Sequence, residues 1–202
     1  MVYSFRDGKN HLSHSSHLTI YTSLLTEKKL IQDCQNGIKQ SQYLLVKRYS
    51  GMLLSVCRRY ARDEAMAKDV LQETLIRIFQ NIGRYEHTGS FEAWMRRIAV
   101  RRSLQWLEKS CFQHELQPVE APGNQYADPE IYAQMGAEEI MGLLRELPKG
   151  FRTVFNLNVV EGYTHKEIAA LLGITEATSR SQLLRARKLL QKLLIQQKKM
   201  VV

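Results

Sequence analysis

The stretch from Tyr163 to Lys188 decides the fold of this chain's C-terminal part, and it reads Tyr-Thr-His-Lys-Glu-Ile-Ala-Ala-Leu-Leu-Gly-Ile-Thr-Glu-Ala-Thr-Ser-Arg-Ser-Gln-Leu-Leu-Arg-Ala-Arg-Lys. Thr164 followed by Glu167 is the pattern of a capping box, in which each side chain satisfies a backbone amide at a helix start. Gly173 predicts the end of this short helix, because glycine enters the left-handed conformation without steric cost. Thr175 predicts the N-cap of a second helix. Two helices joined by a short turn containing glycine predict a helix-turn-helix.

The second helix of this motif is strongly basic. From Glu176 to the C-terminus the sequence holds one acid and seven basic residues. In a helix-turn-helix the second helix enters the major groove of DNA. The sequence therefore predicts a DNA-binding module rather than a helical hairpin whose basic face is merely solvated. The apolar positions, which recur at three- and four-residue spacing, are Leu183, Ala186, Leu190 and Leu193. The basic residues are Arg180, Arg185, Arg187, Lys188, Lys192, Lys198 and Lys199.

The composition of the whole chain agrees with a nucleic-acid partner. Its 202 residues carry a formal net charge of +9, which is typical of proteins that bind polyanions. No apolar run approaches the roughly 18 residues of a membrane-spanning helix. The polar start of the sequence does not have the pattern of a secretory leader. We expect a cytoplasmic protein without membrane insertion.

Cysteine and histidine usage indicates no metal or cofactor site. The cysteines are odd in number and far apart in the sequence, which argues against a disulfide framework or a zinc site. Three histidines spaced three residues apart near the N-terminus lack the surrounding residues that orient metal ligands. The cysteines are Cys34, Cys57 and Cys111, and the histidines are His11, His14 and His17.

Helical periodicity runs through most of the chain and predicts an all-α fold of two small domains. Residues 1–26 show no such periodicity and are expected to form a disordered leader. Helical segments then fill a first domain, residues 27–110. Prolines and a change of composition predict a flexible linker over 111–135. Helices resume in a second domain, 136–195, and a basic tail follows at 196–202.

The last predicted helix of the first domain, about residues 90–109, is both amphipathic and basic. Arg97, Arg101 and Gln105 fall at i, i+4 and i+8 and therefore form one ridge. Basic side chains next to aromatic rings suit a strand of unstacked bases. We expect a second nucleic-acid surface here, with Trp94 and Ile98 belonging to the core. The neighbouring aromatic residues are Tyr85, His87, Phe91 and Trp94.

The motifs together resemble an extracytoplasmic-function (ECF) sigma factor, the minimal two-domain class of the sigma-70 family. Asp69-Val-Leu-Gln-Glu-Thr-Leu-Ile-Arg-Ile-Phe resembles the family's polymerase-binding helix. Ser90-Phe-Glu-Ala-Trp-Met-Arg-Arg-Ile-Ala resembles the start of its promoter −10 helix. The family's −35-binding domain is similar to Leu147-Pro-Lys-Gly-Phe-Arg-Thr-Val-Phe, Glu161-Gly-Tyr-Thr-His-Lys-Glu-Ile-Ala and Leu184-Arg-Ala-Arg.

The resemblance implies a non-enzymatic subunit of RNA polymerase that selects promoters. The first domain would dock on core polymerase and hold melted −10 DNA, and the second would read the −35 element as duplex. The implied polymerase-binding residues are Asp69, Gln72 and Glu73. The implied −10 residues are Tyr85, His87, Thr88, Ser90, Phe91, Arg97, Arg101 and Gln105. The implied −35 residues are Arg180, Ser181, Leu184 and Arg185, with Arg187 and Lys188 placed for phosphates. An anti-sigma factor is a further implied partner, and the free chain is expected to be a monomer.

Four positions depart from the family pattern. Arg101 stands where asparagine is frequent, and Gln105 where aspartate or asparagine is frequent. Ser179 replaces a valine that is usually buried, and Gln182 replaces a usual arginine. The first two bear on the −10 sequence preference and the last two on the −35 contacts.

Two other functions compete with this interpretation. A conventional helix-turn-helix regulator would bind an operator without being a polymerase subunit, but such proteins usually dimerise, and the chain shows no coiled-coil heptads. A nuclease could use Asp69 and Glu73, four residues apart on one helix face. No third acid, histidine or glycine-rich phosphate loop stands in an obvious position to complete that site, so we predict no catalytic residue.

Overall fold

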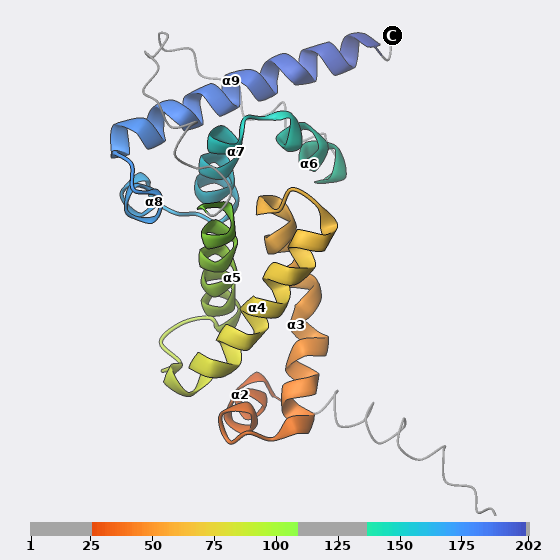
Figure 1. The fold of residues 1–202 in the computed structure, drawn as a ribbon, viewed down its shortest axis with the longest axis vertical. Helices are drawn as coiled ribbons and strands as arrows, with labels where there is room; N and C mark the ends of the chain where they lie inside the picture. The colour runs from red at the N-terminus through yellow and green to blue at the C-terminus, as the bar shows by residue number, and fades with distance from the viewer. Residues whose placement is uncertain (1–25, 109–136, 201–202) are drawn as a thin grey trace, which may run out of the picture. The chain divides into compact units, whose positions relative to one another are not determined.

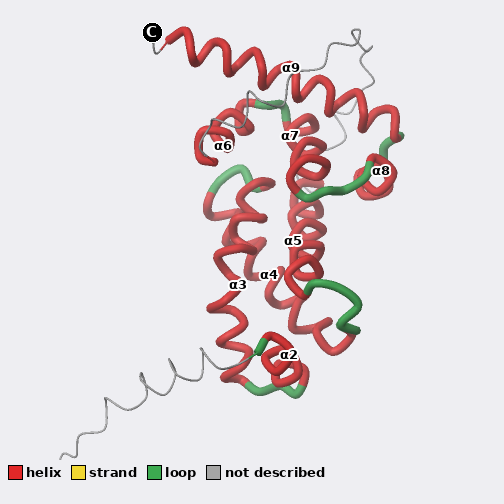
Figure 2. Tube along the Cα trace, turned by 180° about the vertical axis from the view of Figure 1, so that it is seen from behind, coloured by secondary structure: helices red, strands yellow, loops and turns green. Residues whose placement is uncertain are grey.

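The computed structural model describes residues 26–108 and 137–200, and all regular structure in these two ranges is helical (Figures 1 and 2). This confirms the predicted all-α fold. The described residues fall into two compact units, one formed by 26–57 and 63–102 and the other by 58–62, 103–108 and 137–200. The predicted linker, Cys111, His11, His14 and His17, and all of the predicted leader except Thr26 lie outside the described residues.

The first unit begins with two helices joined by a tight turn. Thr26 caps α2 (Glu27–Gln35), and its hydroxyl accepts a hydrogen bond from the Lys29 amide at 3.3 Å. Gly37 has φ +75° and lets the chain turn into α3 (Lys39–Tyr60). Figure 1 shows α2 at the N-terminal end of α3.

Two further helices and a loop complete the first unit. Asp63 caps α4 (Glu64–Asn81), its carboxylate accepting from the Met66 amide at 2.8 Å. A short 3₁₀ turn, η1 (Ile82–Arg84), leads into a loop and then α5 (Phe91–Glu108). Figures 1 and 2 show α3, α4 and α5 alongside one another.

Apolar side chains from these three helices form the core of the first unit. On α4 the buried positions are Ala67, Val70, Thr74 and Ile78, spaced at i, i+3, i+7 and i+11 along one face. Leu71 and Leu75 flank that line and are only half-buried. Each full burial of a large aliphatic side chain contributes about 1.5–3 kcal/mol. Further fully buried core members include Leu45, Leu53, Val56, Phe91 and Met95.

The second unit is built around one long helix. Its elements are α6 (Ala137–Glu146), α7 (Lys149–Phe155), a π-helical turn η3 (Asn156–Val160), α8 (His165–Leu172) and α9 (Glu176–Met200). Helices α6, α7 and α8 all pack against α9 (Figure 1). Helix α9 continues to Met200 and therefore includes most of the stretch, 196–202, that was predicted as a separate basic tail.

The buried face of α9 follows the predicted spacing with one difference. Leu183, Ala186 and Leu190 are buried as predicted. Farther along, Leu194 is buried, whereas the predicted Leu193 is half-buried. The spacing of four residues from Leu190 keeps the stripe on the same side of a straight helix.

The predicted helix-turn-helix is confirmed in its local details. Thr164 and Glu167 form the capping box: the Thr164 hydroxyl accepts from the Glu167 amide at 3.2 Å, and the Glu167 carboxylate accepts from the Thr164 amide at 2.9 Å. Gly173 ends α8 with φ +65°. Thr175 caps α9, its hydroxyl accepting from the Thr178 amide at 3.0 Å.

The turn at Gly173 generates a testable prediction about stability. Gly173→Ala should lower the free energy of unfolding of the second unit by about 1–2 kcal/mol, because a Cβ destabilises the left-handed conformation. Gly142→Ala is the matched control: Gly142 lies inside α6, and a Cβ there meets no atom within 4 Å. That change should stabilise the helix by about 0.5–1 kcal/mol. Urea unfolding of the full chain, followed by circular dichroism, measures both, and effects of the same sign would contradict the assignment of the turn.

Candidate nucleic-acid and polymerase interfaces

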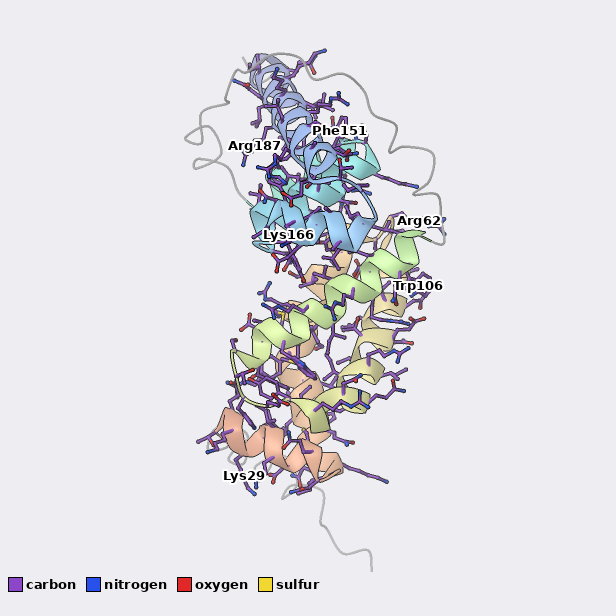
Figure 3. All side chains as sticks on the ribbon, turned by 90° about the vertical axis from the view of Figure 1, so that its left-hand side faces the viewer. Lys29, Arg62, Trp106, Phe151, Lys166 and Arg187 are labelled. Carbon is purple, nitrogen blue, oxygen red and sulfur yellow. The ribbon has the colours of Figure 1, made fainter. Side chains whose placement is uncertain are left out.

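The predicted −35 residues lie outside the buried stripe of α9. Arg180 is exposed, and the other five are partly exposed. Arg180, Leu184 and Arg187 follow i, i+4 and i+7 spacing, which places them on one face. Figure 3 labels Arg187 on α9 and Lys166 on the neighbouring α8. The partly exposed residues are Ser181, Leu184, Arg185, Arg187 and Lys188.

The first turn of α9 holds an ion pair that the sequence interpretation did not identify. Arg180 Nη2 donates to Glu176 Oε2 at 2.8 Å, and the two side chains are 63% and 43% exposed respectively. Four-residue spacing with the acid nearer the N-terminus is the favourable order for such a pair. That spacing is readable in the sequence and is the signal that could have predicted the pair.

A part-buried hydrogen bond connects α8 to α9. Ser179 is fully buried, and its hydroxyl lies 2.8 Å from Nδ1 of His165, the first residue of α8. A valine at this position, usual in the family, would pack there but leave the imidazole without this partner. The serine therefore replaces a purely apolar contact with a directional one.

Several groups determine how readily His165 accepts a proton. Burial lowers the pKa of His165 below its ordinary value, and the positive charges of Arg180 and Arg187 lower it further. The negative charge of Glu176 acts in the opposite direction. His165 therefore lies within the electrostatic reach of the side chains that form the candidate DNA surface.

Gln182 belongs to the packing between α7 and α9 rather than to the DNA surface. Its side chain is buried. A Cβ on Gly150 of α7 would lie only 2.9 Å from Gln182 Oε1. Because Gly150 has no side chain, it leaves the space that the side chain of Gln182 occupies.

The predicted polymerase-binding residues lie on α4, but they differ in their surroundings. Asp69 and Gln72 are exposed. Glu73 forms an ion pair with Arg102 of α5, and its side chain is 37% exposed. Ile76, four residues after Gln72, is 56% exposed on the same face. Because Arg102 of the same chain pairs with Glu73, the acidic residues of this face do not by themselves indicate a cationic partner.

The loop between η1 and α5 combines buried and exposed residues. Tyr85 is buried and its hydroxyl donates to the Gly89 carbonyl. Its ring centroid lies 5.1 Å from that of Phe91 and 5.4 Å from that of Trp94. His87 adopts φ +57°, a left-handed conformation uncommon outside glycine. The aromatic cluster holds the loop against α5 while His87 stays exposed.

The predicted −10 residues of this loop therefore divide into two groups. Phe91 is 0% exposed, so its ring is part of the core and supports the loop rather than presenting a stacking surface to a base. Tyr85 is buried in the same cluster and has the same supporting position. The exposed residues are His87, Thr88 and Ser90, of which Ser90 also caps α5 by accepting from the Ala93 amide at 3.4 Å.

The ridge predicted on α5 is at the surface. Arg97, Arg101 and Gln105 are all exposed. Trp94 and Ile98 precede Arg97 and Arg101 by three residues and therefore border the ridge on the same face of α5. Both are half-buried, so the expectation that they are core residues holds only in part. Trp94 stacks on Phe91 with centroids 5.5 Å apart and an interplanar angle of 16°.

Two kinds of site are absent from the part of the chain that the structure describes: a cluster of metal-ligating side chains and a helix able to span a membrane. Within 26–108 and 137–200, no three His, Cys, Asp or Glu residues gather as a metal site. In the same ranges no helix is both long and apolar enough to cross a bilayer. Cys34 and Cys57 are buried, and burial together with the Asp33 charge raises the pKa of the Cys34 thiol to about 11. At neutral pH this thiol is protonated and therefore a poor nucleophile.

His165 generates a prediction about pH. Because its pKa is lowered in the folded protein, the unfolded chain binds a proton more readily. The stability that neutral His165 contributes is complete above about pH 6.5 and decreases as the pH falls through the lowered folded-state pKa. His165→Gln should reduce this loss in urea unfolding between pH 7.5 and 5.5. Titration of the His165 ring by NMR gives the pKa directly, and a value at or above 6.5 would refute the prediction.

Comparison with known proteins identifies the family. The model for sigma-70 region 2 matches residues 45–110, and the model for sigma-70 region 4 matches residues 137–190, together more than half of the chain. The RNA polymerase sigma-H factor of Pseudomonas aeruginosa is 26% identical over 185 residues, covering 83% of this chain and 93% of that protein. The ECF RNA polymerase sigma-E factor of Haemophilus influenzae is 25% identical over 184 residues, covering 83% and 94%.

Among solved structures, the sigma factor RpoE of Bartonella quintana, in complex with the anti-sigma factor NepR, is similar with a TM-score of 0.49 and 21% identity, over 74% of this chain and 93% of that one. The two family models match in the order of the two units, region 2 before region 4. Sigma factors bind core RNA polymerase and are not themselves enzymes. The chain belongs to the sigma-70 family of RNA polymerase sigma factors, in its extracytoplasmic-function class.

Proposed function

We propose that this sigma factor selects promoters through three separate surfaces: the exposed face of α4 docks on core polymerase, the loop of residues 85–90 with the α5 ridge holds a melted −10 base, and α9 reads the −35 duplex. The observation that carries the proposal is the presence of two exposed basic helix faces on different helices, α5 and α9. A conventional regulator needs only the second. The match to sigma region 2 also favours the polymerase subunit over that alternative.

At the −35 element, the residues of α9 divide by their position along the helix. Arg180 and Arg185 lie nearer its N-terminal end and are assigned to base edges, while Arg187 and Lys188 are assigned to phosphates. Ser181 and Leu184 complete the face that meets the groove. Losing a base contact lowers specificity, whereas losing a phosphate contact weakens binding to every sequence about equally.

At the −10 element, the exposed residues of the loop and ridge are assigned to a base taken out of the stack. Extrusion costs a few kcal/mol, which contacts to the base and to the backbone can offset. His87, Thr88 and Ser90 supply hydrogen-bonding groups at the exposed loop. Arg97, Arg101 and Gln105 supply donors along α5. Tyr85 and Phe91 support this loop from the core.

At the polymerase, we assign the contact to Asp69, Gln72 and Ile76, with Glu73 held in place by Arg102. An exposed apolar side chain between polar ones is the composition expected of a docking surface. The chain acts in the cytoplasm and is a monomer until it meets polymerase. An anti-sigma factor is the further partner that the resemblance implies.

The first prediction from this proposal concerns the docking face. Asp69→Lys should weaken association with core polymerase at least tenfold and leave −35 duplex binding unchanged, because it reverses an exposed charge on α4 without touching the core. Glu146→Lys makes the same change of charge at an exposed position of α6 and should have no effect. We avoid reversing Glu73, because a lysine there would face Arg102 and disturb the packing of α4 on α5. Co-elution of the Asp69→Lys protein with core enzyme at wild-type affinity would place the docking face elsewhere.

The second prediction concerns promoter melting. The double change His87→Asn, Arg101→Ala should abolish permanganate reactivity of the −10 thymines while polymerase association and −35 binding persist. Asparagine is chosen at position 87 because it tolerates the left-handed conformation better than alanine. Lys47→Ala, an exposed basic residue of α3 in the same unit, serves as the control. Undiminished thymine reactivity in the double variant would remove these residues from the −10 site.

A further inference from the structure

The single acid of α9 is placed where a DNA-binding helix would be expected to avoid one. Glu176 is the first residue of α9, and seven basic residues follow it in the sequence. In a helix-turn-helix, the N-terminal residues of the second helix lie closest to base edges. A carboxylate there is repelled by the phosphates on either side of the groove, and this repulsion weakens binding to every sequence. A favourable effect of Glu176 must therefore offset this repulsion.

The stability of α9 gives only a small part of that effect. A carboxylate at a helix N-terminus interacts favourably with the helix dipole. Both side chains of the Glu176–Arg180 ion pair are exposed, and an exposed pair contributes little to stability. Neither term depends on DNA, and an uncharged N-terminal residue with a good cap at Thr175 would supply much of the same stability.

The geometry of the ion pair suits a different effect, the orientation of the Arg180 side chain. A guanidinium carries five N–H donors in a planar fork. Glu176 Oε2 accepts from Nη2 at 2.8 Å, which uses one donor and fixes the plane of the fork relative to the helix. The second Nη2 hydrogen and those on Nη1 remain available, and two parallel donors are what guanine O6 and N7 require. The side chain of Arg180 is 63% exposed. Without the ion pair, this side chain would lose more conformational entropy on making the same contact.

The surroundings of the pair keep that orientation fixed relative to the groove. The buried Ser179, adjacent to Arg180, is hydrogen-bonded to His165 of α8 at 2.8 Å. The first turn of α9 is therefore fastened to α8. Arg180 and Arg187 both act electrostatically on His165, and Glu176 acts against them. Glu176 is thus the acid that balances a group of positive side chains at this end of the helix.

We propose that Glu176 is a positioning residue that determines −35 specificity: it orients Arg180 for a guanine and lowers affinity for all other DNA. The inference rests on the proposed role of α9 as the reader of the −35 duplex. A carboxylate can also accept directly from the amino group of cytosine or adenine. In that case Glu176 would act without Arg180, and the two possibilities give different results in a double-mutant cycle.

The test compares full-length wild type, Glu176→Gln, Arg180→Ala and the double variant. The probe is the duplex that wild type selects from a randomised pool, together with duplexes in which each base pair of that site is replaced in turn. Arg180→Ala should lose about tenfold or more of the preference at one guanine-containing base pair. Glu176→Gln should lose several-fold of the preference at that same base pair and bind scrambled duplex more tightly than wild type. The double variant should match Arg180→Ala in its base preferences.

Three results would overturn the inference. If Glu176→Gln strengthens binding to all duplexes by one factor and leaves the base preferences unchanged, the pair is only a helix-surface interaction. If it alters a different base pair, or still alters preferences in the Arg180→Ala background, Glu176 reads a base itself. If wild type selects no sequence and Arg180→Ala changes nothing, the proposed −35 role of α9 fails and the role of Glu176 fails with it. A loss of helix stability would weaken binding to all duplexes together. It therefore cannot produce a several-fold loss of preference confined to the base pair that Arg180 contacts.

Discussion

The second unit depends on one constraint, the burial of a single stripe along α9. Leu183, Ala186 and Leu190 are buried against the shorter helices, so every residue between them has its orientation fixed by helical geometry. Among the basic residues described on the same helix, Arg180 and Lys192 are exposed, and Arg185, Arg187 and Lys188 are partly exposed. This is how one 25-residue helix serves both as the support of its unit and as a candidate DNA-reading surface. Disrupting these buried side chains would unfold the second unit and with it remove the candidate DNA-reading surface.

Polar contacts within the chain decide which side chains remain available to partners. Glu73 is committed to Arg102, and Ser179 to His165. Asp69, Gln72 and Ile76 extend outward on α4 and are better placed for a large protein partner. On α9 the same reasoning makes the Glu176–Arg180 pair informative, since it lies at the exposed surface rather than between helices. A charged pair of low intrinsic stability, located at a binding face, is more readily explained by orientation than by folding.

The loop at the start of α5, which carries the candidate −10 residues, is supported by buried aromatic rings. Tyr85 and Phe91 are buried, and Trp94 stacks beside them. This cluster anchors both ends of a short segment in which His87 takes an uncommon left-handed conformation. Residues of one motif thus divide between support and contact, and the division follows from which rings can be enclosed by α3, α4 and α5.

The sequence by itself determined the all-α fold and the helix-turn-helix, because caps, turn glycines and apolar periodicity act over only three or four residues. It also determined the family, through motifs that are contiguous in the chain. Only the tertiary structure showed that Phe91 is enclosed, that Glu73 is paired with Arg102, and that Ser179 bonds to His165. Those facts join residues 14 or more positions apart, and a local pattern carries no information about which distant side chains become neighbours when the helices pack.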